Sequence, residues 1–171
     1  MKNNDIIYFG LIIVVVSLLR FVPHPPNMTP VIAVSILAVT WFKRPVFQFG
    51  FPLLIMLVTD MFLGFHSLIP VVYGALVCSA FTGFILKKKL SFSRVLGSGL
   101  MASILFFCIT NFGVWIFSSM YPKTVLGLLA CYSAAIPFFH NTVIATVGVL
   151  FGVFGLNSAV KRWIQPKLLL N

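Results

Sequence analysis

The 171-residue chain is poor in charge, and above all in acidic residues. It has two Asp and Glu residues against twelve Lys and Arg, and charged residues make up 8% of the sequence. An ordinary soluble domain is about 25% charged, so a soluble fold of this size would leave too much apolar surface in water. The scarcity of carboxylates also excludes paired acids for general acid–base catalysis. It leaves little for proton- or sodium-coupled transport.

Motifs of hydrolytic and nucleotide-binding enzymes are missing as well. The sequence contains no HExxH, no phosphate-binding glycine loop and no Ser/His/Asp set at plausible depths. Its three cysteines, Cys78, Cys108 and Cys131, are an odd number, and the first two lie inside apolar runs, which argues against a disulfide framework. We therefore expect a protein that is not an enzyme and has no intrinsic cofactor. Energised transport would need a partner that hydrolyses ATP.

Long apolar runs dominate the sequence instead. Sixty per cent of the residues are hydrophobic, and runs such as 6–22 and 96–117 carry at most one charge. Lipid can serve as the solvent for such segments when each forms a helix that satisfies its own backbone hydrogen bonds. The runs do not have the short alternating pattern of β-barrel strands. The predicted fold class is therefore an all-α integral membrane protein.

We expect six transmembrane helices in a single transmembrane domain, 1–171. The expected spans are about 6–22, 29–42, 46–63, 68–86, 95–117 and 141–156. The segment 124–138, of about 15 residues, covers roughly 22 Å, which is less than the ~30 Å hydrocarbon core. We therefore expect it to form a short helix on the outer surface before the last span.

The basic residues predict the orientation. With six crossings and the N-terminus inside, ten basic residues fall on the cytoplasmic side, and only Arg20 and Lys123 fall outside. A seventh crossing at 124–138 would move the C-terminal basic cluster outside and worsen this balance. We expect both termini in the cytoplasm and the chain in the bacterial inner membrane. Because the basic residues form no single patch, no nucleic-acid partner is expected.

Polar side chains gather at the predicted outer ends of the helices. Polar groups are costly in hydrocarbon, so such a cluster predicts a cavity that opens outward. The alternative is a set of interfacial anchors and loop caps. Asp60 is the only acidic residue within a predicted span, and we expect it to cap a helix or pair with Arg20 rather than couple an ion. The cluster comprises His24, Asn27, Asp60, His66, Asn111, Trp115, Tyr121, His140 and Asn141.

Cys78 is predicted to lie deep in the membrane. It is ten residues into the span 68–86, roughly 15 Å from its outer end and near the middle of the bilayer. The small residues Gly74, Ala75 and Ser79 surround it along the helix. They either let helices pack closely or let a bulky flat ligand reach a sulfur that suits soft and borderline metals. The residues alone leave both interpretations open.

Two strings of residues resemble a known family. Residues 20–30 read RFVPHPPNMTP, and residues 110–141 read TNFGVWIFSSMYPKTVLGLLACYSAAIPFFHN. They resemble the S-components of energy-coupling-factor (ECF) vitamin transporters, and within that set the BtuM-like solitary cobalamin transporters. The resemblance covers nearly the whole chain. It implies six helices with both termini inside, an outward-facing vitamin pocket, and Cys78 as a ligand to the cobalt of cobalamin.

The resemblance therefore implies uptake of vitamin B12 from the outer side of the membrane, with loss of an upper cobalt ligand such as cyanide as ancillary chemistry. The first helix has Gly10, Val14 and Leu18 where many S-components have paired alanines, so a standard ECF energising module is not an expected partner. The expected substrate contacts are Cys78, Asn27, His66, Tyr73, Asn111 and Trp115.

Two alternatives remain beside this interpretation. One is an S-component-like transporter of another vitamin or of a small cation. The other is a non-transporting membrane subunit, for which the stripe Gly148, Gly152 and Gly155 would provide a packing face.

Overall fold

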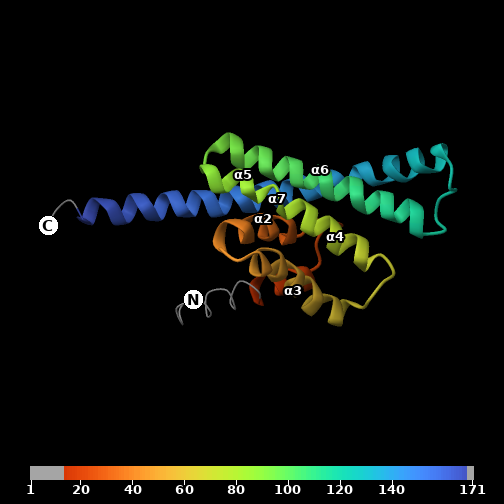
Figure 1. Ribbon diagram of the computed structural model, residues 1–171, viewed down its shortest axis with the longest axis horizontal. Coiled ribbons are helices and arrows are strands. Elements are labelled where there is room, and N and C mark those ends of the chain that lie inside the picture. The colour runs from red at the N-terminus through yellow and green to blue at the C-terminus, as the bar shows by residue number, and fades with distance from the viewer. Residues whose placement is uncertain (1–13, 169–171) are drawn as a thin grey trace.

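The computed structural model describes the backbone of residues 14–168 and the side chains of residues 14–155. Residues 14–21 are helical, so the predicted first span, 6–22, lies partly outside the described residues. Helices and turns make up the described part of the chain, which contains no strand. The labelled helices in Figure 1 are α2 (Val31–Trp41), α3 (Pro45–Leu63), α4 (Ile69–Ala80), α5 (Gly83–Lys88), α6 (Phe92–Phe117) and α7 (Val125–Leu168).

Four helical segments of the described chain are long and apolar enough to cross a membrane. They are 19 to 31 residues long, with mean hydropathy of 1.6 to 2.0. At 1.5 Å per residue, even the shortest covers about 28 Å, close to the thickness of the hydrocarbon core. The chain therefore has the architecture of a multi-pass membrane protein. The four segments are Pro45–Leu63, Ile69–Lys88, Phe92–Phe117 and Val125–Gly155.

The short helix α2 lies at the centre of the bundle (Figure 1). It is 11 residues long, and all residues from Val31 to Val39 are buried. It packs against α3, α4, α5, α6 and α7. Protein on every side explains why its sequence, VIAVSILAVTW, has no polar face.

Proline and glycine determine where several helices begin and end. Arg44 is extended because the ring of the following proline disfavours helical backbone, and Pro45 then begins α3. Gly64 ends α3 with a φ of 99°, a conformation that side chains with a Cβ rarely adopt. The predicted segment 68–86 forms two helices, α4 and α5, joined by a tight turn in which Thr82 N–H donates to the Ser79 carbonyl at 3.1 Å.

The predicted break between 124–138 and 141–156 is wrong. Both segments belong to α7, which runs without interruption from Val125 to Leu168 and extends beyond the other helices (Figure 1). Pro137 removes one hydrogen bond, but aromatic packing holds both sides of it against α6. The Phe107 ring of α6 lies 5.6 Å from the Tyr132 ring and 4.9 Å from the Phe139 ring. Tyr132 also donates a hydrogen bond of 2.6 Å to the Cys108 carbonyl. Packing from a neighbouring helix lets a membrane helix continue through a proline.

Candidate binding site

A cavity of about 280 Å³ lies where the first helix and the linker after it meet α2, α3, α4, α6 and α7. Its wall is mixed, with apolar side chains such as Ile32, Leu76 and Phe106 beside a smaller number of polar groups. A mostly apolar cavity with a few convergent polar groups is typical of a small-molecule site. The polar lining residues are Arg20, Asn27, Thr29, Thr110, Asn111 and Thr142.

An ion pair forms one side of this cavity. Arg20 Nη2 lies 3.1 Å from Asp60 Oδ1, and both side chains are largely buried, at 14% and 5% exposed. Tyr73 donates a hydrogen bond of 3.0 Å to the other carboxylate oxygen, and Arg20 also donates to Thr59 Oγ1. The predicted pairing of Asp60 with Arg20 is confirmed. The network joins the first helix to α3 and α4, and it leaves this wall of the cavity without net charge.

The linker at the cavity is held in a defined conformation. Asn27 has a φ of 64°, a left-handed conformation that asparagine tolerates better than most residues. Met28 N–H donates to the Pro25 carbonyl at 3.0 Å, which closes the turn. Asn141 on α7 donates a hydrogen bond of 3.0 Å to the Pro26 carbonyl. The linker is therefore fixed to α7, which also lines the cavity through Thr142.

Two polar residues of α6 contribute to the cavity from adjacent positions. Asn111 Nδ2 donates to the Phe107 carbonyl at 2.8 Å, and Thr110 Oγ1 donates to the Phe106 carbonyl at 2.7 Å. Each side chain thus uses one donor within its own helix. The Asn111 amide has a further N–H and a carbonyl oxygen, and the Thr110 hydroxyl retains its lone pairs. These groups could recognise a ligand by hydrogen bonding.

The structure brings together only part of the predicted substrate site. Asn27 and Asn111 line the cavity. Tyr73 lies behind its wall, bonded to Asp60. Trp115 donates to the Pro122 carbonyl at 2.9 Å and so fixes the loop between α6 and α7. His66 is exposed between α3 and α4, away from the cavity-lining residues.

Cys78 does not line the cavity, and its side chain is exposed. Leu76 lines the cavity, and two further residues along a helix rotate Cys78 by about 200°. The small residues beside Cys78 pack α4 closely against α6: Ala75 and Ser79 are fully buried, and Ser79 donates to the Ala102 carbonyl at 3.1 Å. In this arrangement Ala75 and Ser79 serve helix packing, whereas Gly74 is exposed like Cys78.

The predicted site omitted Arg20 and three threonines that line the cavity. Thr29, Thr110 and Thr142 had no distinguishing pattern, since threonine is common in membrane helices. A signal was nevertheless present. The strings 20–30 and 110–141 supply all six polar lining residues except Thr142, which directly follows the second string. Segments about 90 residues apart in the chain therefore meet at one site.

The comparisons with known proteins give one match. Residues 1–168 match DUF6580, described as a family of unknown function. No curated protein matches the chain, and no solved structure matches it.

Proposed function

The chain belongs to the DUF6580 family, and from its membrane architecture and its polar cavity we propose that it binds a small molecule for uptake across the bacterial inner membrane. The observation that carries the proposal is the meeting of Arg20, Asn27, Thr29, Thr110 and Asn111 around one cavity. Polar side chains that gather inside a membrane protein, away from lipid, are typical of a substrate pathway.

The chemistry of the cavity favours a neutral, hydrogen-bonding ligand with an apolar part. Asp60 already neutralises Arg20, so neither an anion nor a small cation gains an unpaired opposite charge there. Hydroxyl and amide groups remain as recognition groups. A volume of about 280 Å³ is just below the usual range for small-molecule sites, roughly 300–1,000 Å³. A vitamin of modest size suits these dimensions.

Cobalamin is the specific candidate that the family resemblance supports. It is larger than the cavity, so its entry would require the helices to separate, and ligation of cobalt by Cys78 would require the exposed face of α4 to join the site. We keep cobalamin as one member of the substrate class, with Cys78 as the residue that distinguishes it from the others.

Transport through this cavity requires α2 to move. Val31 and Ile32 line the cavity at the start of α2, whereas Leu37 and Thr40 line a second cavity near its end. Between them, residues 33–36 are at most 3% exposed. We propose six crossings with both termini inside, so that the polar cavity faces outward and the segment 33–36 forms the barrier.

A binding experiment tests the proposal. Protein purified in detergent is incubated with one vitamin at a time (cyanocobalamin, biotin, riboflavin or nicotinamide), then desalted, and the retained ligand is quantified. We expect one of them to be retained and Asn111→Ala to weaken its binding about tenfold, since loss of a buried hydrogen-bond partner costs about 1–3 kcal/mol. Ile104→Ala, on the exposed face of the same helix, is the matched control and leaves binding unchanged.

The same experiment with Cys78→Ala distinguishes two substrates: a corrinoid whose cobalt is bound by Cys78, and another vitamin that binds without this residue. If cyanocobalamin is retained with a shifted visible spectrum that Cys78→Ala abolishes, the substrate is a corrinoid and the cobalt contacts sulfur. If another vitamin is retained and only Asn111→Ala weakens it, the substrate is bound by the cavity without Cys78. Retention of none of these vitamins by the folded protein would contradict the proposal and favour a non-transporting subunit.

A further inference from the structure

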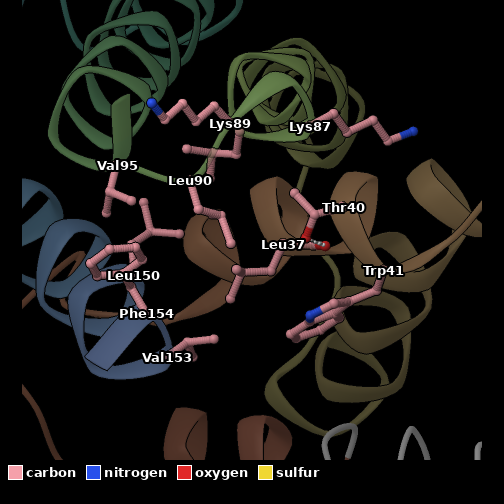
Figure 2. A pocket seen from close by; sticks show the side chains of 11 residues that line it. Leu37, Thr40, Trp41, Lys87, Lys89, Leu90, Val95, Leu150, Val153 and Phe154 are labelled. Atoms are coloured by element: carbon pink, nitrogen blue, oxygen red, sulfur yellow. Dashed lines mark hydrogen bonds between the residues drawn. The ribbon is translucent and has the colours of Figure 1, made fainter. Parts of the chain in front are cut away.

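A second cavity, of about 520 Å³, lies at the other end of α2. It is enclosed by the end of α2, by α5, by the start of α6 and by α7. Figure 2 shows apolar side chains, among them Leu37, Leu90, Val95, Leu150 and Val153, around the space. Lys87 and Lys89 lie along one margin of it (Figure 2). The cavity is therefore apolar within and cationic at its edge.

The positive charge at this margin has no acidic counterpart in the described chain. The sequence has two acidic residues; Asp5 lies outside the described residues, and Asp60 is bound to Arg20. Three consecutive lysines, 87–89, end α5 and begin the turn to α6, and Arg94 follows in the first turn of α6. Arg94 Nη1 is buried with no hydrogen-bond partner among the described residues. Arg94 is not among the residues that line the cavity, but its charge adds to the positive potential that favours an anion at this margin.

The start of α6 also favours binding of an anion. The helix begins at Phe92, and no side chain caps its first backbone N–H groups. The N-terminus of a helix carries a partial positive charge and binds phosphate through those N–H groups. Val95, in the same turn, lines the cavity. In Figure 2 the ammonium groups of Lys87 and Lys89 point away from the space in opposite directions, and Lys87 Nζ lies 4.9 Å from the centre of the Phe84 ring. An anionic group at this end of the cavity would lie near the N-terminus of α6, and the flexible lysine side chains would turn toward it.

We infer that this cavity binds an anionic phospholipid, such as phosphatidylglycerol, with an acyl chain among the apolar side chains and the phosphate at the lysine margin. A phospholipid is complementary to the cavity in two respects: its acyl chain matches the apolar interior, and its phosphate matches the lysine margin. A helix bundle in a membrane is surrounded by acyl chains, and basic pockets between membrane helices bind anionic lipid headgroups. A soluble phosphate compound would satisfy the lysines but leave the apolar interior empty. The inference does not depend on the function proposed for the other cavity.

Native mass spectrometry of the purified protein tests this inference. The protein is mixed with equal amounts of phosphatidylglycerol and phosphatidylcholine, and the retained lipid is counted. We expect phosphatidylglycerol to be retained at least about tenfold better, since each lysine near an anionic headgroup contributes roughly a factor of five. In Lys87→Gln/Lys89→Gln this preference falls to near unity. Equal retention of the two lipids by the wild-type protein would overturn the inference.

Two control variants distinguish a site from general surface charge. Lys43→Gln/Lys88→Gln removes the same charge from exposed residues that do not line the cavity, and the preference should persist. Val153→Trp fills the cavity without changing charge, and it should reduce retention of phosphatidylglycerol several-fold. If the two lysine variants lose the preference equally, or if Val153→Trp retains the lipid as the wild type does, the cavity is not the binding site.

Discussion

The pair Arg20–Asp60 is a buried ion pair at the wall of the candidate site. Removing one partner of a buried pair leaves an uncompensated charge, which costs about 3–5 kcal/mol. We therefore predict that Asp60→Asn strongly destabilises the protein, with a fall of roughly 10 °C in the melting temperature measured in detergent. The reason is the pair distance of 3.1 Å with both side chains largely buried.

A double variant is the control for this prediction. Arg20→Met/Asp60→Leu removes both charges and keeps similar volumes, so it should recover most of the stability that either single variant loses. If the double variant melts lower than both single variants, the two residues stabilise the fold independently, and the interpretation as a mutually neutralising pair is wrong.

For single residues, the sequence predicted which polar side chains need a partner better than it predicted which face of a helix a residue lies on. The charge of Asp60 inside an apolar run is visible in the sequence and demands a partner, so its pairing with Arg20 could be predicted. The position of Cys78 around the axis of α4 could not. Every residue from Val71 to Ala80 apart from Tyr73 is small or apolar, so the sequence has no polar stripe that distinguishes one face of this helix. Packing against α6 and α2 determines the rotation.

Among the helices, the contact between α2 and α5 is unusually close. A Cβ built at Gly83 would lie 2.4 Å from the Ile36 carbonyl oxygen and 2.8 Å from the Val39 Cβ. These are backbone and near-backbone atoms that cannot move away easily. We predict that Gly83→Ala destabilises the protein by about 1–3 kcal/mol, the usual cost of overpacking. Thermal unfolding in detergent measures it.

Gly74 provides a matched control one helix earlier. A Cβ at Gly74 meets nothing within 4 Å, and alanine is favoured over glycine in a helix interior by up to about 1 kcal/mol. Gly74→Ala should leave stability unchanged or raise it. If both glycine variants shift the melting temperature in the same direction by the same amount, helix propensity rather than the close approach of α5 to α2 is responsible.

The sequence predicted which segments form helices more reliably than it predicted where each helix begins and ends. The apolar runs at 46–63 and 95–117 predicted helices that the structure contains as α3 and α6, because long apolar runs leave no alternative in lipid. The break predicted after residue 138 failed because Pro137 and the polar pair His140–Asn141 resemble a helix end locally. Phe107 packs against Tyr132 before Pro137 and against Phe139 after it. These partners are about 30 positions away in the sequence, so no local sequence pattern predicts the contact.

For the whole molecule, the main feature is a pair of cavities at the two ends of the buried central helix α2. The polar cavity gathers hydroxyls and amides, and the other cavity has lysines at its margin. The apolar sequence of α2 explains why the bundle packs around it. Which polar residues share a cavity depends on how the first helix, α6 and α7 meet, and this is a property of the tertiary structure alone.

The central claim is that the polar cavity is a site inside the membrane that opens to the outside. Labelling of single cysteines with a membrane-impermeant maleimide on intact spheroplasts tests it directly, in a background with the three native cysteines replaced by serine. We predict that Asn111→Cys, in the cavity, is labelled from outside. Ile104→Cys, on the exposed face of α6, should not be labelled from either side. Thr40→Cys, in the other cavity, should be labelled only after the membranes are opened.

Ser119→Cys, in the loop between α6 and α7, controls for insertion and orientation and should be labelled on intact spheroplasts. If Asn111→Cys is labelled together with Ser119→Cys, the cavity is open to water from the outside, as a site for uptake requires. If Ser119→Cys is labelled but Asn111→Cys is not, or is labelled only in opened membranes, the cavity does not open outward and the account of its function is contradicted.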